Sequence, residues 1–425
     1  MRVLKYPRPV EMIVLVNAIG FGLLFFYKKP YDYFILIAGL SVILLVGFGY
    51  FAIRKAKLGD GYLFLISGML SSIGIIMLYR LDRELGFKQI VWFGISIAAF
   101  FASYFLYRRY QVWERLTCYY PAISLFLFVA TLLFGRSING AKNWIFIGKF
   151  SIQPSECIKI IFVFFIAAFF NKYKEEFKEL TALRFKKEDI KLYILMSGAY
   201  MHLGLMVIQK EWGTALLLFL VYFMLVYVLI NNRLFMLINA GMASLGGIGG
   251  ILFVSHIKVR VDTWLNPWKD IAGKGYQITQ SLFAIGSGGF FGTGIGLGRP
   301  DFIPEVNTDF IFSAICEEMG IFGGVAIVLL YFILAYRGFK IALYTVENFT
   351  KTLALGLTLL FGFQTFIIVG GVIKLIPLTG ITLPFISYGG SSLIVSFIAL
   401  GILQAISAGP AAYVTRKEKL DGESK

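Results

Sequence analysis

The hydrophobic positions of this chain form long, nearly uninterrupted runs, and the polar positions are confined to the stretches between them. A helix that spans a membrane needs about 20 mostly apolar residues, because lipid offers the backbone no hydrogen-bond partner. The pattern therefore predicts an all-α, polytopic membrane protein. The twelve predicted spans are residues 10–27, 31–53, 61–80, 88–107, 118–134, 157–170, 192–209, 213–230, 233–255, 309–335, 352–374 and 385–408.

Composition and charge support this interpretation. Of the 425 residues, 58% are hydrophobic and only 15% are charged, and the formal net charge is +16. The basic residues lie in short clusters between the apolar runs, as the positive-inside rule leads one to expect, so the charge does not indicate nucleic-acid binding. The same rule predicts that both termini are cytoplasmic and that the long loop before residue 309 is extracytoplasmic.

The remaining segments add few functional signals. The first apolar run follows a basic flank and resembles a signal peptide, but no small-residue cleavage site follows, so we interpret it as a retained helix. Residues 171–191 are mixed in charge sign and amphipathic, and they predict a solvated cytoplasmic helix. The three cysteines and two histidines are scattered along the chain and predict neither a disulfide framework nor a metal site.

The polar stretch from Trp264 to Asp309 interrupts the apolar pattern for the longest distance and is the first candidate for function. Trp264 and Trp268 are four residues apart, which would bring their rings together at headgroup level and hold Asp270 near the membrane surface. Asp270 then has two interpretations. It is either a catalytic acid or a loop carboxylate that satisfies a turn or pairs with a neighbouring lysine.

Two further features lie in the same stretch. Residues 276–291 read YQITQSLFAIGSGGFF and predict a short apolar helix, too short to span. Seven glycines follow between residues 286 and 298, and their amides could hold a phosphate or form a tightly packed turn. No strand-to-helix context supports a nucleotide-binding fold.

Polar residues at predicted helix starts provide more candidates. Glu156 and Lys159 are three residues apart, so they can pair on one helix face, either as a structural ion pair or as the lining of a cavity. Glu211 is a second acid at a helix start, where the macrodipole favours it. The loop before residue 156 offers further polar groups for a pyrophosphate, although surface loops commonly carry such residues. These are Arg136, Asn139, Lys142 and Trp144.

Five of these polar segments, taken together and in order, resemble the FtsW/RodA/SpoVE family of peptidoglycan polymerases, also called SEDS proteins. The resemblance runs from about Leu63 to Ser407. The segments are NGAKNWIFIGKFSIQPSE, QKEWGTAL, NPWKDIAGKGYQITQSLFAIGSGGFFGTGIGLG, FIPEVNTDFIFSAICEEMG and PLTGITLPFISYGGSS.

The resemblance implies a domain organisation. Residues 1–58 would form two extra N-terminal helices, residues 59–412 a ten-helix core, and residues 413–425 a cytoplasmic tail. Residues 256–308 would be the extracytoplasmic catalytic loop within that core. Three positions differ from the family pattern. Glu211 replaces the usual aspartate, Ile271 stands where proline often follows the catalytic acid, and Ile368 stands where asparagine is expected.

The resemblance also implies the site. Asp270 matches the essential carboxylate, Glu156 and Lys159 match a paired acid and base, and Glu211 replaces the usual aspartate. The other residues expected to bind substrate or line the cavity are Arg136, Lys142, Lys210, Lys274, Gln280 and Ser387.

The implied activity is transfer of the growing undecaprenyl-pyrophosphate-linked glycan onto lipid II at the outer face of the bacterial cytoplasmic membrane. Asp270 would act as general base on the attacking sugar hydroxyl, a divalent cation (Mg²⁺ or Mn²⁺) could help to offset the leaving pyrophosphate, and a class B penicillin-binding protein is the implied partner. A flippase for a lipid-linked precursor is the main alternative, but the chain shows no internal repeat of the kind that carriers have. A scaffold that only activates its partner is the third hypothesis.

Overall fold

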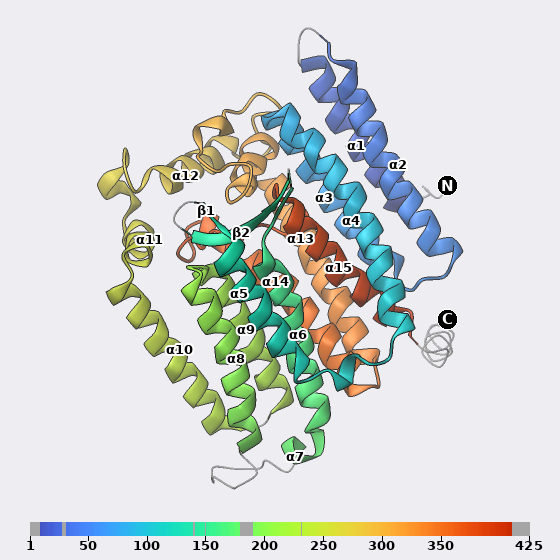
Figure 1. Ribbon diagram of the computed structural model, residues 1–425. Coiled ribbons are helices and arrows are strands. Elements are labelled where there is room, and N and C mark those ends of the chain that lie inside the picture. Colours follow the sequence, from blue (N-terminus) through green and yellow to red (C-terminus); the bar gives the residue numbers. More distant parts are fainter. Residues whose placement is uncertain are drawn as a thin grey trace, which may run out of the picture. The chain divides into compact units, whose positions relative to one another are not determined.

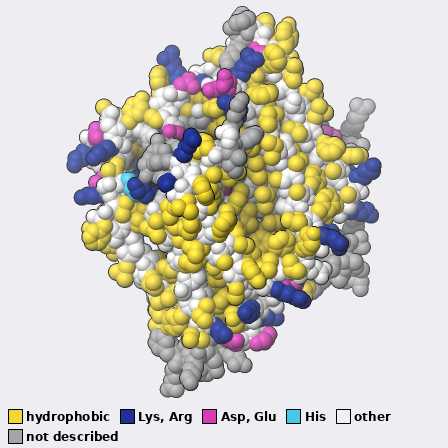
Figure 2. All heavy atoms as spheres, viewed as in Figure 1, with side chains coloured by type: hydrophobic (Ala, Val, Ile, Leu, Met, Phe, Trp, Pro, Cys, Tyr) yellow, Lys and Arg dark blue, Asp and Glu magenta, His cyan; other side chains and the backbone are white. Residues whose placement is uncertain are grey.

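A computed structural model describes residues 9–27, 31–138, 141–148, 150–178, 190–230 and 232–409 (Figure 1). Within these ranges, eleven helices are long and apolar enough to cross a membrane. The twelfth predicted span is α5 (Tyr119–Phe134), an apolar helix of 16 residues. Figure 2 shows hydrophobic side chains over much of the visible surface, as a protein solvated by lipid requires.

The chain divides into two compact units. Unit 1 comprises Met1–Tyr104, Tyr276–Leu334 and Thr382–Ala408, and unit 2 comprises Phe105–Gly275, Ala335–Ile381 and Gly409–Lys425. The elements that lie wholly or mostly in unit 1 are α1 (Pro9–Tyr27), α2 (Tyr33–Lys55), α3 (Gly61–Leu81), α4 (Arg83–Arg109), α12 (Tyr276–Gly288), η4 (Pro300–Phe302), α13 (Ile311–Tyr344) and α15 (Gly390–Ser407).

Unit 2 contains the remaining elements. Besides α5, they are η1 (Trp113–Arg115), β1 (Arg136–Ile138), β2 (Ala141–Ile147), β3 (Phe150–Ile152), α6 (Pro154–Lys172), α7 (Lys174–Lys178), α8 (Ile190–Ile208), α9 (Trp212–Leu229), α10 (Arg233–Phe253), α11 (Ser255–Leu265), η3 (Pro267–Asp270) and α14 (Asn348–Val372).

The two N-terminal helices pack against α3 in unit 1. Gly20 permits the close approach, since a Cβ there would lie 2.7 Å from Cδ1 of Ile76. Asn17 is fully buried, and its amide nitrogen donates to the hydroxyl of Ser72 at 3.0 Å. Because a polar contact inside an apolar layer is costly to break, these helices are an integral part of unit 1.

The core of unit 2 is built around α6, which packs against α5 and α14, while α9 packs against α8 and α14. The predicted loop before α6 contains an antiparallel sheet of order β1-β2-β3. Strand β2, which reads AKNWIFI, is rich in the aromatic and β-branched residues that favour strands. Gly148 (φ 62°) lies between β2 and β3. The predicted helical fold is thus confirmed, with this small sheet added.

Two predicted segments are described only in part or not at all. Within the expected solvated helix at 171–191, the described residues are the last two of α6, Tyr173, the short α7 (Lys174–Lys178) and the first two of α8, and residues 179–189 lie outside the described ranges. The predicted tail 413–425 and Asn139 also lie outside them.

Candidate functional site

Glu156 and Lys159 form a buried ion pair on the first turns of α6. Their exposures are 7% and 3%, and Nζ of Lys159 lies 2.8 Å from Oε2 of Glu156. Nζ also donates to Oε1 of Gln364 on α14 at 3.2 Å. The predicted pairing three residues apart is therefore present, and the pairing and the added hydrogen bond make the burial of both charges tolerable.

Glu211 is the N-cap residue of α9, and its carboxylate collects donors from three segments. Oε1 accepts hydrogen bonds from the side chains of Asn143, Gln153 and Ser155, each at 2.9 Å. Oε2 accepts one from the hydroxyl of Thr214 at 3.1 Å. A buried carboxylate needs such donors to replace lost water. Glu211 thereby ties β2 and the start of α6, which carries the ion pair, to the start of α9.

Asp270 lies at the end of η3 with its side chain exposed. Oδ2 accepts the backbone N–H of Lys274 at 3.0 Å, and the backbone N–H of Gly275 donates to the carbonyl of Asp270 at 2.9 Å. A Cβ at Gly273 would lie 2.5 and 2.6 Å from the two carboxylate oxygens. A side chain at position 273 would thus displace this carboxylate, and a Cβ at Gly275 would collide with the carbonyl oxygen of Pro267. The two glycines therefore let the turn close while the carboxylate stays accessible.

The helix that precedes Asp270 is anchored through its tryptophan. Nε1 of Trp264 on α11 donates to the carbonyl of Lys374 at 3.1 Å, whereas Trp268 in η3 is 49% exposed. Trp264 is thus held to the loop that follows α14, and anchoring of the two rings at headgroup level stays a prediction.

The predicted cations of unit 2 other than Lys159 are exposed, and side-chain contacts explain the positions of Arg136 and Lys142. Arg136 stacks on the ring of Phe146 with 5.4 Å between Cζ and the centroid. Nζ of Lys142 donates to the carbonyl of Leu132 at 2.5 Å, in the last turn of α5, where a cation complements the helix dipole. Lys210 and Lys274 are exposed as well.

Gln280 and Ser387 lie in unit 1, unlike the other predicted site residues. Gln280 is half-buried on α12. The hydroxyl of Ser387 donates to the carbonyl of Thr308 at 2.6 Å and accepts the N–H of Leu383 at 2.9 Å. These bonds join two loops of unit 1, so Ser387 has a bracing role within that unit.

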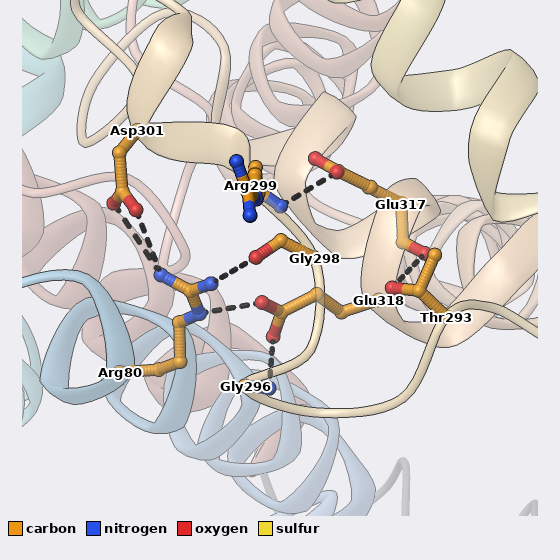
Figure 3. Close-up of polar contacts among 8 residues, drawn as sticks. All are labelled: Arg80, Thr293, Gly296, Gly298, Arg299, Asp301, Glu317 and Glu318. Atoms are coloured by element: carbon orange, nitrogen blue, oxygen red, sulfur yellow. Dashed lines mark hydrogen bonds and ion pairs between the residues drawn. The ribbon is translucent and has the colours of Figure 1, made fainter.

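A network around Arg80 was not predicted from the sequence (Figure 3). Nε of Arg80 lies 2.5 Å from Oε1 of Glu318, Nη1 lies 3.3 Å from Oδ1 of Asp301, and Nη2 donates to the carbonyl of Gly298 at 2.7 Å. The other oxygen of Glu318 accepts the N–H of Gly296 at 3.0 Å. The available signal was the pair of adjacent acids at the start of an apolar span, which is costly unless the acids are paired.

The same network decides between the two interpretations of the glycine run. The N–H groups of Thr293 and Gly294 donate to the carbonyls of Glu317 and Glu318 at 2.9 and 3.0 Å. Gly292, Gly294 and Gly296 have φ of 86°, 104° and 87°, a region that favours glycine. These amides bond to carbonyls of α13 just before Gly320 (φ 69°), where the helical backbone is interrupted, so the run forms a tightly packed turn.

Comparisons with known proteins agree with this architecture. The chain is similar to the peptidoglycan glycosyltransferase RodA of Mycobacterium tuberculosis, with 36% identity over 389 residues that cover 87% of this chain and 83% of that protein. It is 35% identical to stage V sporulation protein E of Bacillus subtilis over 365 residues, which cover 82% of this chain and 96% of the other.

Two solved structures are also similar. RodA of Thermus thermophilus matches with a TM-score of 0.59 and 27% identity, over 82% of this chain and 96% of that one. A chain from work titled "Structural coordination of polymerization and crosslinking by a peptidoglycan synthase complex" matches with a TM-score of 0.68 and 26% identity, over 82% and 97%. The cell cycle protein family FtsW/RodA/SpoVE matches residues 61–410, and this chain therefore belongs to that family.

Proposed function

We propose that this protein is a peptidoglycan glycosyltransferase that polymerises lipid II. The observation that carries the proposal is the exposed carboxylate of Asp270, held by the backbone of its own turn, in a chain whose relatives are named peptidoglycan glycosyltransferases. A general base must reach a substrate hydroxyl within hydrogen-bond distance. The exposure of Asp270 leaves its carboxylate free for such contact with a substrate, which supports the proposal.

In the proposed reaction, Asp270 accepts the proton of a sugar hydroxyl on lipid II. The hydroxyl oxygen forms a bond to the anomeric carbon of the growing glycan, and the bond from that carbon to the pyrophosphate oxygen breaks. Undecaprenyl pyrophosphate leaves with the electron pair. A single displacement inverts the anomeric carbon and needs no covalent intermediate with the protein.

The buried groups of unit 2 would support this chemistry by fixing the surrounding elements. The pair formed by Glu156 and Lys159 fixes α6 against α14, and Glu211 fixes the starts of α6 and α9. The exposed cations Arg136, Lys142 and Lys274 are candidates for offsetting the leaving pyrophosphate.

A divalent cation would have to be held mainly by the substrate. Among the described residues, no group of three or more His, Cys, Asp and Glu side chains could hold a metal ion. Mg²⁺ often binds through substrate phosphates with few protein ligands, so Mg²⁺ or Mn²⁺ would enter with the pyrophosphate. The proposed steps do not depend on it.

The proposal includes an orientation and a partner. The distribution of Lys and Arg favours cytoplasmic termini and an extracytoplasmic Asp270, on the side where lipid II would be polymerised. A class B penicillin-binding protein is the proposed partner, and a relative of known structure belongs to a complex described as coordinating polymerisation and crosslinking.

The test is glycan-chain formation from lipid II by the purified chain with its cognate penicillin-binding protein, whose transpeptidase site is blocked. Wild type and Asp270→Asn are compared at equal amounts of assembled complex. Loss of polymer in a folded, partner-bound variant supports the proposal. Polymer formation at the wild-type rate rejects Asp270 as the base and returns attention to transport or scaffolding.

A further inference from the structure

One face of α11 is directed at the loop that follows α14. His256, Arg260 and Trp264 are spaced four residues apart and so share a helix face. Nη1 of Arg260 donates to the carbonyl of Thr379 at 2.7 Å, and Trp264 bonds to the carbonyl of Lys374. These two contacts place the face against residues 374–379, with His256 one turn before Arg260.

The start of α9 reaches the same loop. A Cβ at Gly213 would lie 2.8 Å from the carbonyl oxygen of Thr379 and 2.9 Å from its Cβ. Lys210 lies in the turn before α9 with a left-handed backbone (φ 64°) and an exposed side chain. Thr379 is therefore contacted by Arg260 of α11 and approached closely by Gly213 at the start of α9.

Three basic side chains share this region. The pKa of His256 is lowered by partial burial and by the positive charges of Arg260 and Lys210, so the two cations act on one imidazole from different elements. The carboxylate of Glu211 is also nearby, but it accepts hydrogen bonds from four other side chains, those of Asn143, Gln153, Ser155 and Thr214. The local potential at His256 is thus positive.

Buried polar atoms without protein partners accompany these charges. Gln209 is only 2% exposed, and neither its amide nitrogen nor its amide oxygen has a partner. Oγ1 of Thr379 and Nε2 of His256 are likewise buried and unpartnered. Buried polar groups are nearly always hydrogen-bonded, so orphans on three segments point to a polar ligand.

We propose that Lys210, His256 and Arg260, with the hydroxyl of Thr379 and the amide of Gln209, form a phosphate-binding subsite. All five can donate hydrogen bonds, and Arg and Lys are the residues that most often bind phosphate oxygens. The phosphate could belong to a lipid-linked pyrophosphate or to an anionic phospholipid headgroup. The assignment of this phosphate to a lipid-linked pyrophosphate rests on the proposed function, because the proposed reaction releases undecaprenyl pyrophosphate at this end of unit 2.

The test is binding to the purified full-length chain, measured by native mass spectrometry with two probes, undecaprenyl pyrophosphate and phosphatidylglycerol. The variants are Arg260→Gln and Lys210→Asn. Asparagine tolerates the left-handed backbone at position 210, so the second variant removes the charge without straining the turn. Lys258→Gln is the matched control, since Lys258 is exposed on α11 and points away from the face of Arg260.

We expect each subsite variant to bind undecaprenyl pyrophosphate about tenfold more weakly than wild type, because a hydrogen bond from a charged group is lost. Lys258→Gln should bind as wild type does. If both subsite variants lose phosphatidylglycerol and retain undecaprenyl pyrophosphate, the phosphate subsite stands but serves the headgroup. If both variants bind both probes as wild type does, the subsite is rejected.

Folding and the proposed reaction are controlled separately. Arg260→Lys keeps the charge and should recover part of the binding, and thermal unfolding reports whether Arg260→Gln disturbs the loop at Thr379. Asp270→Asn should bind undecaprenyl pyrophosphate normally. If Asp270→Asn still polymerises lipid II while Arg260→Gln and Lys210→Asn lose binding, the proposed catalytic role fails and the subsite remains.

Discussion

Glu318 in unit 1 and Asp270 in unit 2 are both carboxylates that accept a backbone N–H from a glycine-rich loop. Glu318 accepts from Gly296, is 1% exposed and pairs with Arg80 at 2.5 Å. Asp270 accepts from Lys274 and remains exposed. The same kind of hydrogen bond, from a backbone N–H to a carboxylate, thus fixes a loop in unit 1 and orients an exposed carboxylate in unit 2. Burial and a charged partner make the difference.

The comparison extends to the surroundings. Arg80 donates hydrogen bonds to Glu318, Asp301 and the carbonyl of Gly298. Its positive charge is therefore compensated within the network that fixes this loop. In unit 2, the buried charges of Glu156, Lys159 and Glu211 are satisfied among helices and the sheet. Asp270 can therefore be presented on a framework whose own charges are already compensated.

The largest expected effect is on activity. Asp270→Asn should lower the rate of lipid II polymerisation by about 10²–10⁴, the range that general bases contribute, and it should leave the unfolding temperature unchanged because the side chain is exposed. Asp301→Asn is the matched control, since Asp301 in η4 is also an exposed carboxylate, and its ion pair with Arg80 lies in unit 1 and takes no part in the proposed reaction. Equal losses of activity in both variants would contradict a catalytic role that is specific to Asp270.

The next effect is on stability in unit 1. Arg80→Met leaves Glu318 buried and uncompensated, so we expect a loss of about 3–5 kcal/mol in the free energy of unfolding. Chemical unfolding in detergent measures it, and limited proteolysis should show earlier cleavage between residues 292 and 301. The double variant Arg80→Met with Glu318→Gln should recover part of the loss. A double variant as unstable as the single one would contradict the pairing.

Glu211 provides a smaller effect of a different kind. Glu211→Ala leaves the donors of Asn143, Gln153 and Ser155 without their acceptor, and each unpaired buried group costs about 1–3 kcal/mol. Glu211→Asp keeps the charge but withdraws it by about one methylene, so it should destabilise less than alanine does. The unfolding temperatures of the three proteins give the order. An aspartate variant as unstable as alanine would mean that position, not charge, governs this cluster.

The smallest expected effect is the pH dependence at His256. Its pKa lies below the usual value because of partial burial and the charges of Arg260 and Lys210, so the unfolded chain takes up this proton first as the pH falls. The stability from the neutral ring is present above about pH 6.5 and declines below it. Unfolding temperatures at pH 7.5 and 5.5 should differ less in His256→Gln and in Lys210→Asn than in wild type. If the difference between the two unfolding temperatures is the same in both variants as in wild type, the positive electrostatic potential at His256 is contradicted.

The sequence predicts those features that depend on neighbours along the chain. Hydrophobic run length locates the eleven described helices that are long enough to span and also the shorter α5, because a spanning helix must satisfy its backbone within one segment. The spacing of Glu156 and Lys159 predicts their ion pair, because residues three apart are adjacent on a helix. The turn considered for the carboxylate of Asp270 is local as well, since that carboxylate accepts the N–H of Lys274 four residues later.

Only the tertiary structure decided the contacts between distant segments. Arg80 and Glu318 are 238 residues apart in the chain, and Glu211 draws donors from positions 58 and 68 residues away. Arg260 meets Thr379 across 119 residues. Periodicity and spacing report only on the few residues that one turn of helix or one loop brings together. Which buried charge finds which partner depends on how the helices pack, and that packing is a property of the whole fold.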